Sequence, residues 1–276
     1  MKQKEITEAV ENSFKVIDKL FRKILKEFNA DDIHDFRVEV KKLRAFLRMA
    51  HINDENDNMV IPKLLKTFYG YIGIIRNIQL QKHRLFEYIT KCSANTPHEY
   101  VDLLDKEKNY WQEEAIDLMA DNNFDDVKEK IIKQLPGKIG KAQVLKFTQT
   151  KLNLLTTLID SLHDDAEVHT IRKILKDLLY TWNYVQDKSV LPKAISNEEE
   201  LKSITEILGC FRDICIEFEF LQPEYLGKIQ TEDESKFLLE FYKSLQDKKK
   251  RITRKALHSL NALHDELLHS EIIINL

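Results

Sequence analysis

Apolar residues recur at every third or fourth position through most of the chain, which is the spacing of an amphipathic helix. This period predicts helices at about residues 3–28, 32–51, 60–91, 97–120, 139–163, 167–187, 197–221 and 234–270. Glycine and proline, which interrupt helices, number only 6 and 5 in 276 residues. The pattern and the composition together predict an all-α fold.

Several of the expected helices begin with residues that cap helix N-termini. One of the two aspartates at residues 31–32 is expected to cap the second helix. Thr96 precedes a proline and is followed by Glu99, which is the pattern of a capping box. Ser196 with Glu199 repeats that pattern at the start of the expected helix 197–221.

The clearest internal boundary is QLPGKIG, Gln134 to Gly140, near the middle of the chain. Its Pro-Gly pair breaks the helical pattern, and a second glycine follows within four residues. This boundary divides the chain into residues 1–135 and 138–276, each expected to form one helical bundle repeat.

The two halves contain related segments. IHDFRVEVKKLRAFL aligns with VHTIRKILKDLLYTW, which places His34 over His169. Further along, IGIIRNI aligns with LGCFRDI, which pairs Gly73 with Gly209, Arg76 with Arg212 and Asn77 with Asp213. The simplest interpretation is an internal duplication into two similar four-helix units.

The first of these segments carries a basic stripe. At about 100° per residue, one helix face of about 80° collects a row of cations about 21 Å long. Its members are His34, Arg37, Lys41, Arg44 and Arg48, with Lys42 beside them. The adjoining arc is apolar and is expected to contact the core: Ile33, Phe36, Val40, Leu43 and Leu47.

The second copy keeps His169, Arg172 and Lys176 beside an apolar arc of Val168, Ile171, Leu175, Leu178 and Trp182. It then loses charge, because Leu179 stands where the first copy has Arg44 and Asp177 stands where it has Lys42. Two further basic faces lie near the termini, one including Lys19 and Arg22, the other Arg251 and Lys255. Solvated surface lysines explain those terminal faces equally well.

A row of Arg, Lys and His with few carboxylates between them suits an extended polyanion. Arg binds phosphate oxygens with a planar fork, Lys supplies a point charge, and His becomes cationic when phosphates surround it. The formal net charge of the chain is -3, so the signal is the segregation of charge and not its total.

Other features limit the class of protein. No apolar run reaches the length of a membrane span, and the N-terminus lacks the apolar block of a secretory signal. The three cysteines form no CxxC pair, which suits a reducing compartment and predicts neither a disulfide framework nor a structural metal site. We therefore expect a cytoplasmic protein without cofactor or metal.

The duplicated segments resemble the CHAD family, the conserved histidine α-helical domain. The residues that carry the resemblance are His34-x-x-Arg37-x-x-x-Lys41-Lys42-Leu43-Arg44 and His169-x-x-Arg172-x-x-x-Lys176-Asp177-Leu178-Leu179-Tyr180, with the two Gly-x-x-Arg-(Asn/Asp) segments. The likeness spans nearly the whole chain, so both halves together would form one CHAD domain.

The resemblance implies two antiparallel four-helix bundles related by pseudo-twofold symmetry, with a shared basic groove that binds inorganic polyphosphate without hydrolysing it. Carried over by position, it implicates His34, Arg37, Lys41, Lys42, Arg44, His169, Arg172 and Lys176. We add Arg48 as a continuation of the stripe, and Lys19, Arg22, Arg76, Arg212, Arg251 and Lys255 as further candidates. Other polyanions are candidate ligands, and polyphosphate granules are a candidate place of association.

Two other functions compete with this one. An all-α metal-dependent phosphohydrolase of the HD type is suggested by His34-Asp35, His163-Asp164 and His264-Asp265. That site needs converging ligands, whereas Asp35 projects about 100° away from His34. A nucleic-acid-binding module would use the same basic stripe, but exposed aromatic residues for base stacking are not interleaved with it. We therefore expect neither an enzyme nor an obligate nucleic-acid partner.

Overall fold

The computed structural model describes residues 1–53, 61–185 and 193–269, and these contain helices and no strand. The all-α prediction is confirmed. The first half contributes α1 (Gln3–Glu27), α2 (Ala30–Ala50), α3 (Lys63–Cys92), α4 (His98–Ala120) and α5 (Asp125–Gln134). The second half contributes α6 (Lys141–Asp160), α7 (Asp165–Thr181), η1 (Trp182–Tyr184), α8 (Lys193–Ser196), α9 (Glu198–Glu219), α10 (Pro223–Leu226) and α11 (Glu232–Leu268).

Each expected helix is present, with ends that differ by a few residues. The apolar periodicity did not predict α5, because only Val127 and Ile131 of its ten residues are buried and two positions give a weak helical pattern. It also missed the short segments η1, α8 and α10. Residue 60, residues 186–187 and residue 270, at the ends of three expected helices, lie outside the described residues.

The capping predictions were wrong in detail. Asn29, not an aspartate, caps α2, and its side-chain oxygen accepts hydrogen bonds from the backbone N–H groups of Asp31 and Asp32. Asn197 caps α9 in place of Ser196 by accepting from the N–H of Glu199. In both cases an asparagine within three residues of the expected cap has the favourable position.

The apolar arcs form the core as expected. Ile33, Phe36, Val40, Leu43 and Leu47 of α2 are at most 2% exposed. Their counterparts in α7, Val168, Ile171, Leu175 and Leu178, are also buried. Trp182 is half-buried, and its ring N–H donates to the carbonyl of Ile195.

Three apolar clusters hold the helices together. One joins α1, α2, α3 and α5 and takes in Val144 and Phe147 of α6. A second lies among α6, α7, α9 and α11, and a third packs α3 and α4 against α9 and α11. The loop at Pro136-Gly137 does separate α5 from α6, but the first and third clusters each combine residues from both sides of it. The division into two duplicated bundles stays a prediction.

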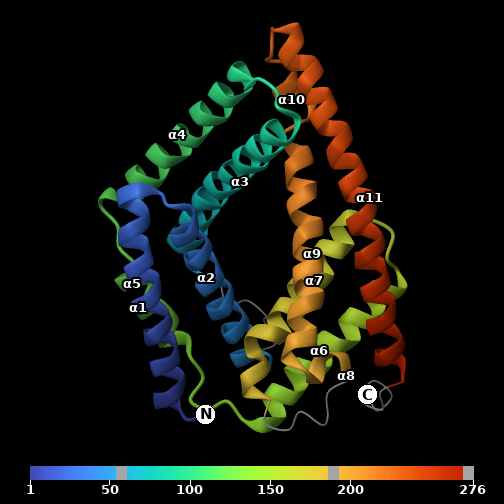
Figure 1. Ribbon diagram of the computed structural model, residues 1–276. Coiled ribbons are helices and arrows are strands. Elements are labelled where there is room, and N and C mark those ends of the chain that lie inside the picture. Colours follow the sequence, from blue (N-terminus) through green and yellow to red (C-terminus); the bar gives the residue numbers. More distant parts are fainter. Residues whose placement is uncertain (54–60, 186–192, 270–276) are drawn as a thin grey trace.

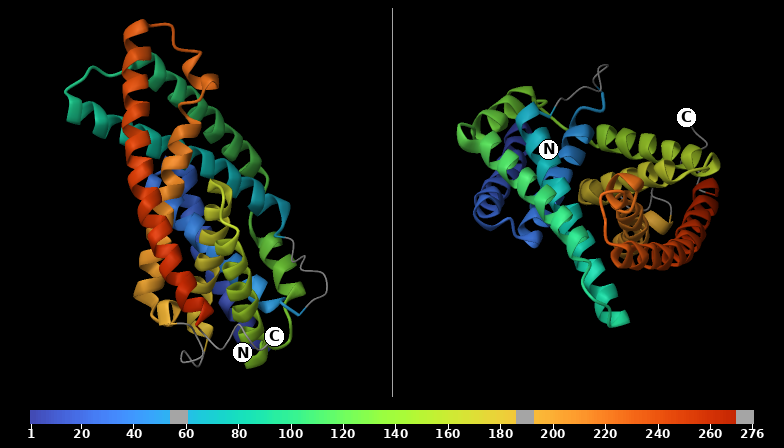
Figure 2. Two further views of the ribbon diagram at one scale, coloured as in Figure 1. Left: turned by 90° about the vertical axis from the view of Figure 1, so that its right-hand side faces the viewer. Right: turned by 90° about the horizontal axis from the view of Figure 1, so that it is seen from above.

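The two halves meet along their motif-bearing helices. Figure 1 shows α1, α2 and α5 on the left and α6, α7, α9 and α11 further to the right, with the lower part of α2 beside α7. The structure places α2 in contact with α7, and α3 in contact with α9. Figure 2 shows α11 running along most of the length of the molecule. This packing brings the two basic stripes to one interface.

Candidate functional site

The motif residues of α2 and α7 gather around the ammonium group of Lys41. Burial, followed by the charges of Arg37, Arg172 and Lys176, lowers the pKa of Lys41 to about 7, while Asp213 opposes the shift. Two of these cations belong to the other half of the chain. We call the whole group the cation cluster: His34, Arg37, Lys41, Arg76, His169, Arg172, Lys176 and Arg212.

Both histidines belong to this cluster. Burial, then Arg76 and Lys41, lower the pKa of His34, and Asp35 and Asp31 oppose them weakly. Burial lowers the pKa of His169 to about 4, helped by Lys173, Arg212, Arg172 and Lys41. Lys41 therefore acts on both imidazoles, which are neutral at pH 7 in the free protein.

Each arginine of the motif lies against the glycine of its own half. The guanidinium of Arg37 lies 4.2 Å from the ring centroid of Tyr69, and its Nη1 donates to the Tyr69 carbonyl at 2.8 Å. It lies so close to Gly73 that an added Cβ would be 2.2 Å from Nη1. The corresponding Cβ at Gly209 would be 3.4 Å from Nη2 of Arg172. The glycines thus leave room for a cation on the neighbouring helix.

This difference predicts unequal effects of two alanine substitutions. Gly73→Ala should displace the Arg37 side chain and reduce the free energy of unfolding by about 1–3 kcal/mol. Gly209→Ala meets only an ordinary contact and should be neutral or stabilise α9 by about 0.5–1 kcal/mol, because alanine favours helix. Urea denaturation of both variants measures this, and equal effects would contradict the close Arg37–Gly73 packing.

Several buried nitrogen atoms of the cluster lack a hydrogen-bond partner in the described part of the chain. Among the described residues, Nε of Arg76, Nδ1 of His169 and Nε of Arg172 are buried without a hydrogen bond. Burial also lowers the pKa of Lys176, with Arg172 adding to it and Glu206 opposing it. Concentrated positive charge with unsatisfied nitrogen atoms is costly for a folded protein unless an anion completes it.

Tyr69, which was not predicted from the sequence, holds Arg37 in place at the site. Its ring lies under Arg37, and its carbonyl holds the guanidinium. Tyr69, Gly73 and Arg76 have a 4-3 spacing and so share one face of α3. That spacing could have indicated that Tyr69 belongs to the site. An aromatic residue on an apolar helix is usually part of the core, however, so the spacing alone did not distinguish Tyr69.

Arg48 was expected at the site and is engaged elsewhere. Its Nε donates to Oδ2 of Asp177 at 3.0 Å, and its Nη2 pairs with Oδ1 of the same carboxylate. Lys151 of α6 adds a third contact to Asp177 at 3.1 Å. Asp177, which replaces a basic residue of the motif, therefore forms a structural ion pair between α2 and α7.

Asp177→Asn should destabilise the fold by about 2–3 kcal/mol, because it leaves Arg48 and Lys151 without their carboxylate. The expected loss lies below that of a fully buried pair since the Arg48 side chain is 38% exposed. Asp247→Asn is the matched control, because that carboxylate is 75% exposed and 3.7 Å from Lys250. It should change stability by less than about 0.5 kcal/mol in chemical denaturation.

The remaining candidates divide by location. Arg76 and Arg212 belong to the cluster, and Arg212 also pairs with Glu219 at 3.3 Å. Lys42 is exposed beside Glu39 at 3.6 Å. Arg44 is half-buried, and within the described ranges no ion pair involves it. Lys19, Arg22, Arg251 and Lys255 are exposed on α1 and α11, and no contact places them at the cluster in the described part of the chain.

The His-Asp dipeptides do not converge. His34 lies in the cluster, His163 is exposed before α7, and His264 on α11 pairs with Oδ1 of Asp160 at 2.8 Å. The described residues hold no group of three or more His, Cys, Asp or Glu side chains that could bind a metal ion. In the same residues, no helix is long and apolar enough to span a membrane.

A comparison with protein families matches the CHAD domain over residues 8–222. The chain belongs to the CHAD domain family. The match covers α2, α3, α7 and α9, which carry every member of the cation cluster, and it ends before α11. A search of curated proteins found no match. The CHAD domain therefore contains the whole candidate site.

Proposed function

We propose that this CHAD protein binds inorganic polyphosphate at the cation cluster and does not hydrolyse it. The supporting observation is the convergence of cations from both halves of the chain on Lys41. In the free protein, burial and the neighbouring cations both disfavour the charged form of Lys41. A polyanion relieves that repulsion and accepts hydrogen bonds from the open Nε atoms of Arg76 and Arg172, and from Nδ1 of His169 once that ring is protonated. CHAD domains are associated with polyphosphate binding, which agrees with this assignment.

The cluster suits phosphates better than nucleic-acid bases. Phe36 and Phe46 are buried in the core. Arg37 covers the ring of Tyr69, and Lys176 lies 5.8 Å from the ring centroid of Tyr180. Base stacking requires exposed aromatic faces, so these rings support cations and not bases.

The cluster also disfavours the phosphohydrolase alternative. A divalent metal beside His34 would face the charges of Arg76 and Lys41, which add to the effect of burial in lowering the pKa of that imidazole. Repulsion at this position opposes metal binding. With Mg²⁺ or Mn²⁺ added, we expect no phosphate release from polyphosphate or nucleotides. Metal-dependent turnover that His34→Ala abolishes would favour the hydrolase instead.

The direct test is a binding titration with long-chain polyphosphate, single-stranded DNA and RNA at matched salt. Polyphosphate should bind tightest, and its affinity should fall steeply as salt increases because bound phosphates release counterions. Equal affinity for the three polymers would reject a polyphosphate site. Tighter binding of a nucleic acid would support the nucleic-acid alternative.

Affinity should fall as pH rises from about 6 to about 9. In the free protein Lys41 loses its proton near pH 7, whereas a bound polyanion stabilises the charged ammonium. Binding above pH 7 must therefore take up a proton, and each further increase in pH weakens it. Protonation of the two histidines, whose pKa values are lowered in the free protein, adds affinity on the acid side. Titrations at constant ionic strength measure the effect, and pH-independent affinity would contradict it.

A further inference from the structure

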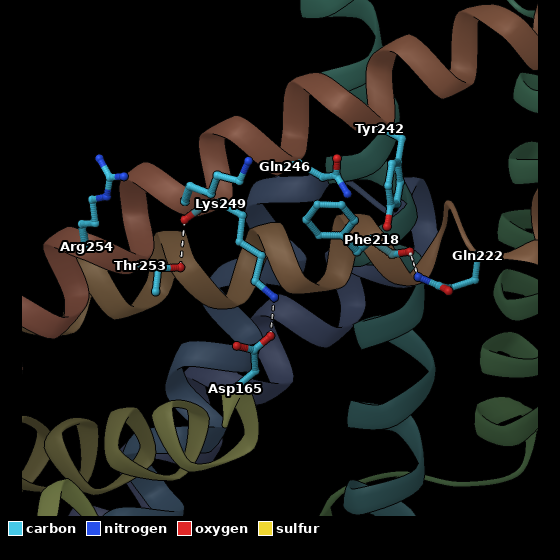
Figure 3. A pocket seen from close by; sticks show the side chains of 9 residues that line it. Asp165, Phe218, Gln222, Tyr242, Gln246, Lys249, Thr253 and Arg254 are labelled. Atoms are coloured by element: carbon cyan, nitrogen blue, oxygen red, sulfur yellow. Dashed lines mark hydrogen bonds and ion pairs between the residues drawn. The ribbon is translucent and has the colours of Figure 1, made fainter. Parts of the chain in front are cut away.

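A second site candidate lies away from the cation cluster, between α9 and α11. A cavity of about 730 Å³ is bounded there by the two helices and by Asp165 at the start of α7 (Figure 3). This volume is within the range of about 300–1,000 Å³ that small-molecule sites occupy. Most of its lining residues belong to α11, beyond the CHAD match. We call it the α9–α11 pocket.

One end of the pocket is aromatic. Phe218 and Tyr242 meet edge to face with ring centroids 5.0 Å apart, and both are half-buried. Gln246 lies one helical turn from Tyr242, and Figure 3 shows its amide beside the tyrosine ring. An aromatic face next to an amide can stack a flat heterocycle and bond to its polar edge.

The middle of the pocket carries a carboxylate. Oδ2 of Asp165 pairs with Nζ of Lys249 and accepts from Sγ of Cys215 at 3.6 Å. Its other oxygen has no hydrogen bond within the described part of the chain, and the side chain is 53% exposed. A carboxylate oxygen accepts hydrogen bonds from hydroxyl groups, so this position suits a sugar and repels a phosphate.

The other end is cationic. Lys250 and Arg254 are exposed on α11, and Figure 3 shows Arg254 at the far end from Tyr242. Lys250 has only a distant carboxylate, Asp247 at 3.7 Å, and Arg254 has no ion pair in the described ranges. Tyr242 and Arg254 are about 18 Å apart along the helix axis. Phosphate groups fit this end, since arginine and lysine bind them with charge-assisted hydrogen bonds.

We propose that the α9–α11 pocket binds a nucleotide. The order of aromatic, carboxylate and cationic groups along α11 matches the order of base, sugar and phosphates in such a ligand. The base stacks on Tyr242, the sugar hydroxyls bond to Asp165, and the phosphates bind Lys250 and Arg254. Inorganic polyphosphate has no ring or hydroxyl groups, so it gains nothing from the aromatic end.

The test is calorimetric titration of the full chain with ATP, adenosine and tripolyphosphate at matched ionic strength. Tyr242→Ala should weaken ATP and adenosine about ten-fold, as expected for a lost base stack, and Tyr242→Phe should restore both. Arg254→Ala should weaken ATP but not adenosine. The matched controls are Tyr110→Ala, which removes a 52% exposed ring on α4, and Lys243→Ala, which removes an exposed cation on α11. Neither control should change ATP affinity.

A variant of the cation cluster separates the two sites. In an Arg172→Gln/Lys176→Gln background, ATP should bind with nearly unchanged affinity while polyphosphate affinity falls about 100-fold. The nucleotide proposal is overturned if ATP does not bind saturably, if Tyr242→Ala leaves its affinity unchanged, or if the background variant abolishes it. None of those results contradicts the polyphosphate proposal, because the cation cluster and the α9–α11 pocket are separate sites. In particular, Tyr242→Ala should leave polyphosphate affinity at the wild-type value.

Discussion

Replacing Lys41 with methionine should stabilise the folded protein while weakening its binding of polyphosphate. Methionine keeps the length of the side chain but removes a charge that lies buried among Arg37, Arg172 and Lys176. Removing such an ion should raise the free energy of unfolding by about 1–3 kcal/mol at pH 7. Urea denaturation measures this change directly.

The pH dependence of that gain follows from the direction of the pKa shift. The pKa of Lys41 is about 7 in the folded protein and 10.5 ordinarily, so the unfolded chain binds more protons between these values. The Lys41 contribution to wild-type stability therefore improves as pH rises through this window. The advantage of Lys41→Met should be largest below about pH 7 and shrink toward pH 10.

The same substitution should reduce polyphosphate affinity about ten-fold and lower the slope of log affinity against log salt by about one. It should also flatten the loss of affinity above pH 7. Lys66→Met is the matched control, because Lys66 is exposed on α3. The control should change neither stability nor affinity substantially. If Lys41→Met is less stable than the wild type and binds polyphosphate equally well, two claims are refuted: that the charge of Lys41 is repelled in the cation cluster, and that Lys41 binds polyphosphate.

Neutralising the α7 side of the cluster should have the largest effect on binding. Arg172→Gln/Lys176→Gln removes two of the three cations that act on Lys41 while keeping polar, though shorter, side chains. We expect a loss of about 100-fold in polyphosphate affinity and a decrease of about two in the salt slope. Circular dichroism should show an intact fold, because both side chains are only partly buried and neither forms an ion pair among the described residues.

The control for this variant is Lys66→Gln/Lys243→Gln, which removes the same charge from two exposed positions on α3 and α11. It should retain most of the wild-type affinity and nearly the same salt slope. If both double variants lose affinity equally, total charge and not the cluster determines binding. If the Arg172/Lys176 variant binds normally, the second copy of the motif has no part in the site.

The helices and their buried faces could be predicted from the sequence because both depend on local spacing. The arc of Ile33, Phe36 and Val40 lies on one face of any helix with this sequence, and water drives that face into a core. The basic stripe follows from the same periodicity. His34, Arg37 and Lys41 were therefore identified before their neighbours were known.

Only the tertiary structure decided which faces meet, because contacts between distant helices leave no trace in local spacing. The start of α4 shows this plainly. Glu234 of α11 accepts hydrogen bonds from the N–H groups of Glu99 and Tyr100, while Glu99 in turn accepts from the N–H groups of Gln230 and Thr231. The local pattern instead assigned that helix start to Thr96, which is not its cap.

The division within the basic stripe has the same origin. Lys41 and Arg48 lie on one face of α2 at spacings that make them look equivalent. Packing against α7 buries Lys41 among cations, so that burial and then these charges lower its pKa, and it places Arg48 against the carboxylate of Asp177. The sequence by itself therefore determined which residues carry the charge, and the packing of α2 on α7 decided which charges remain without a counterion.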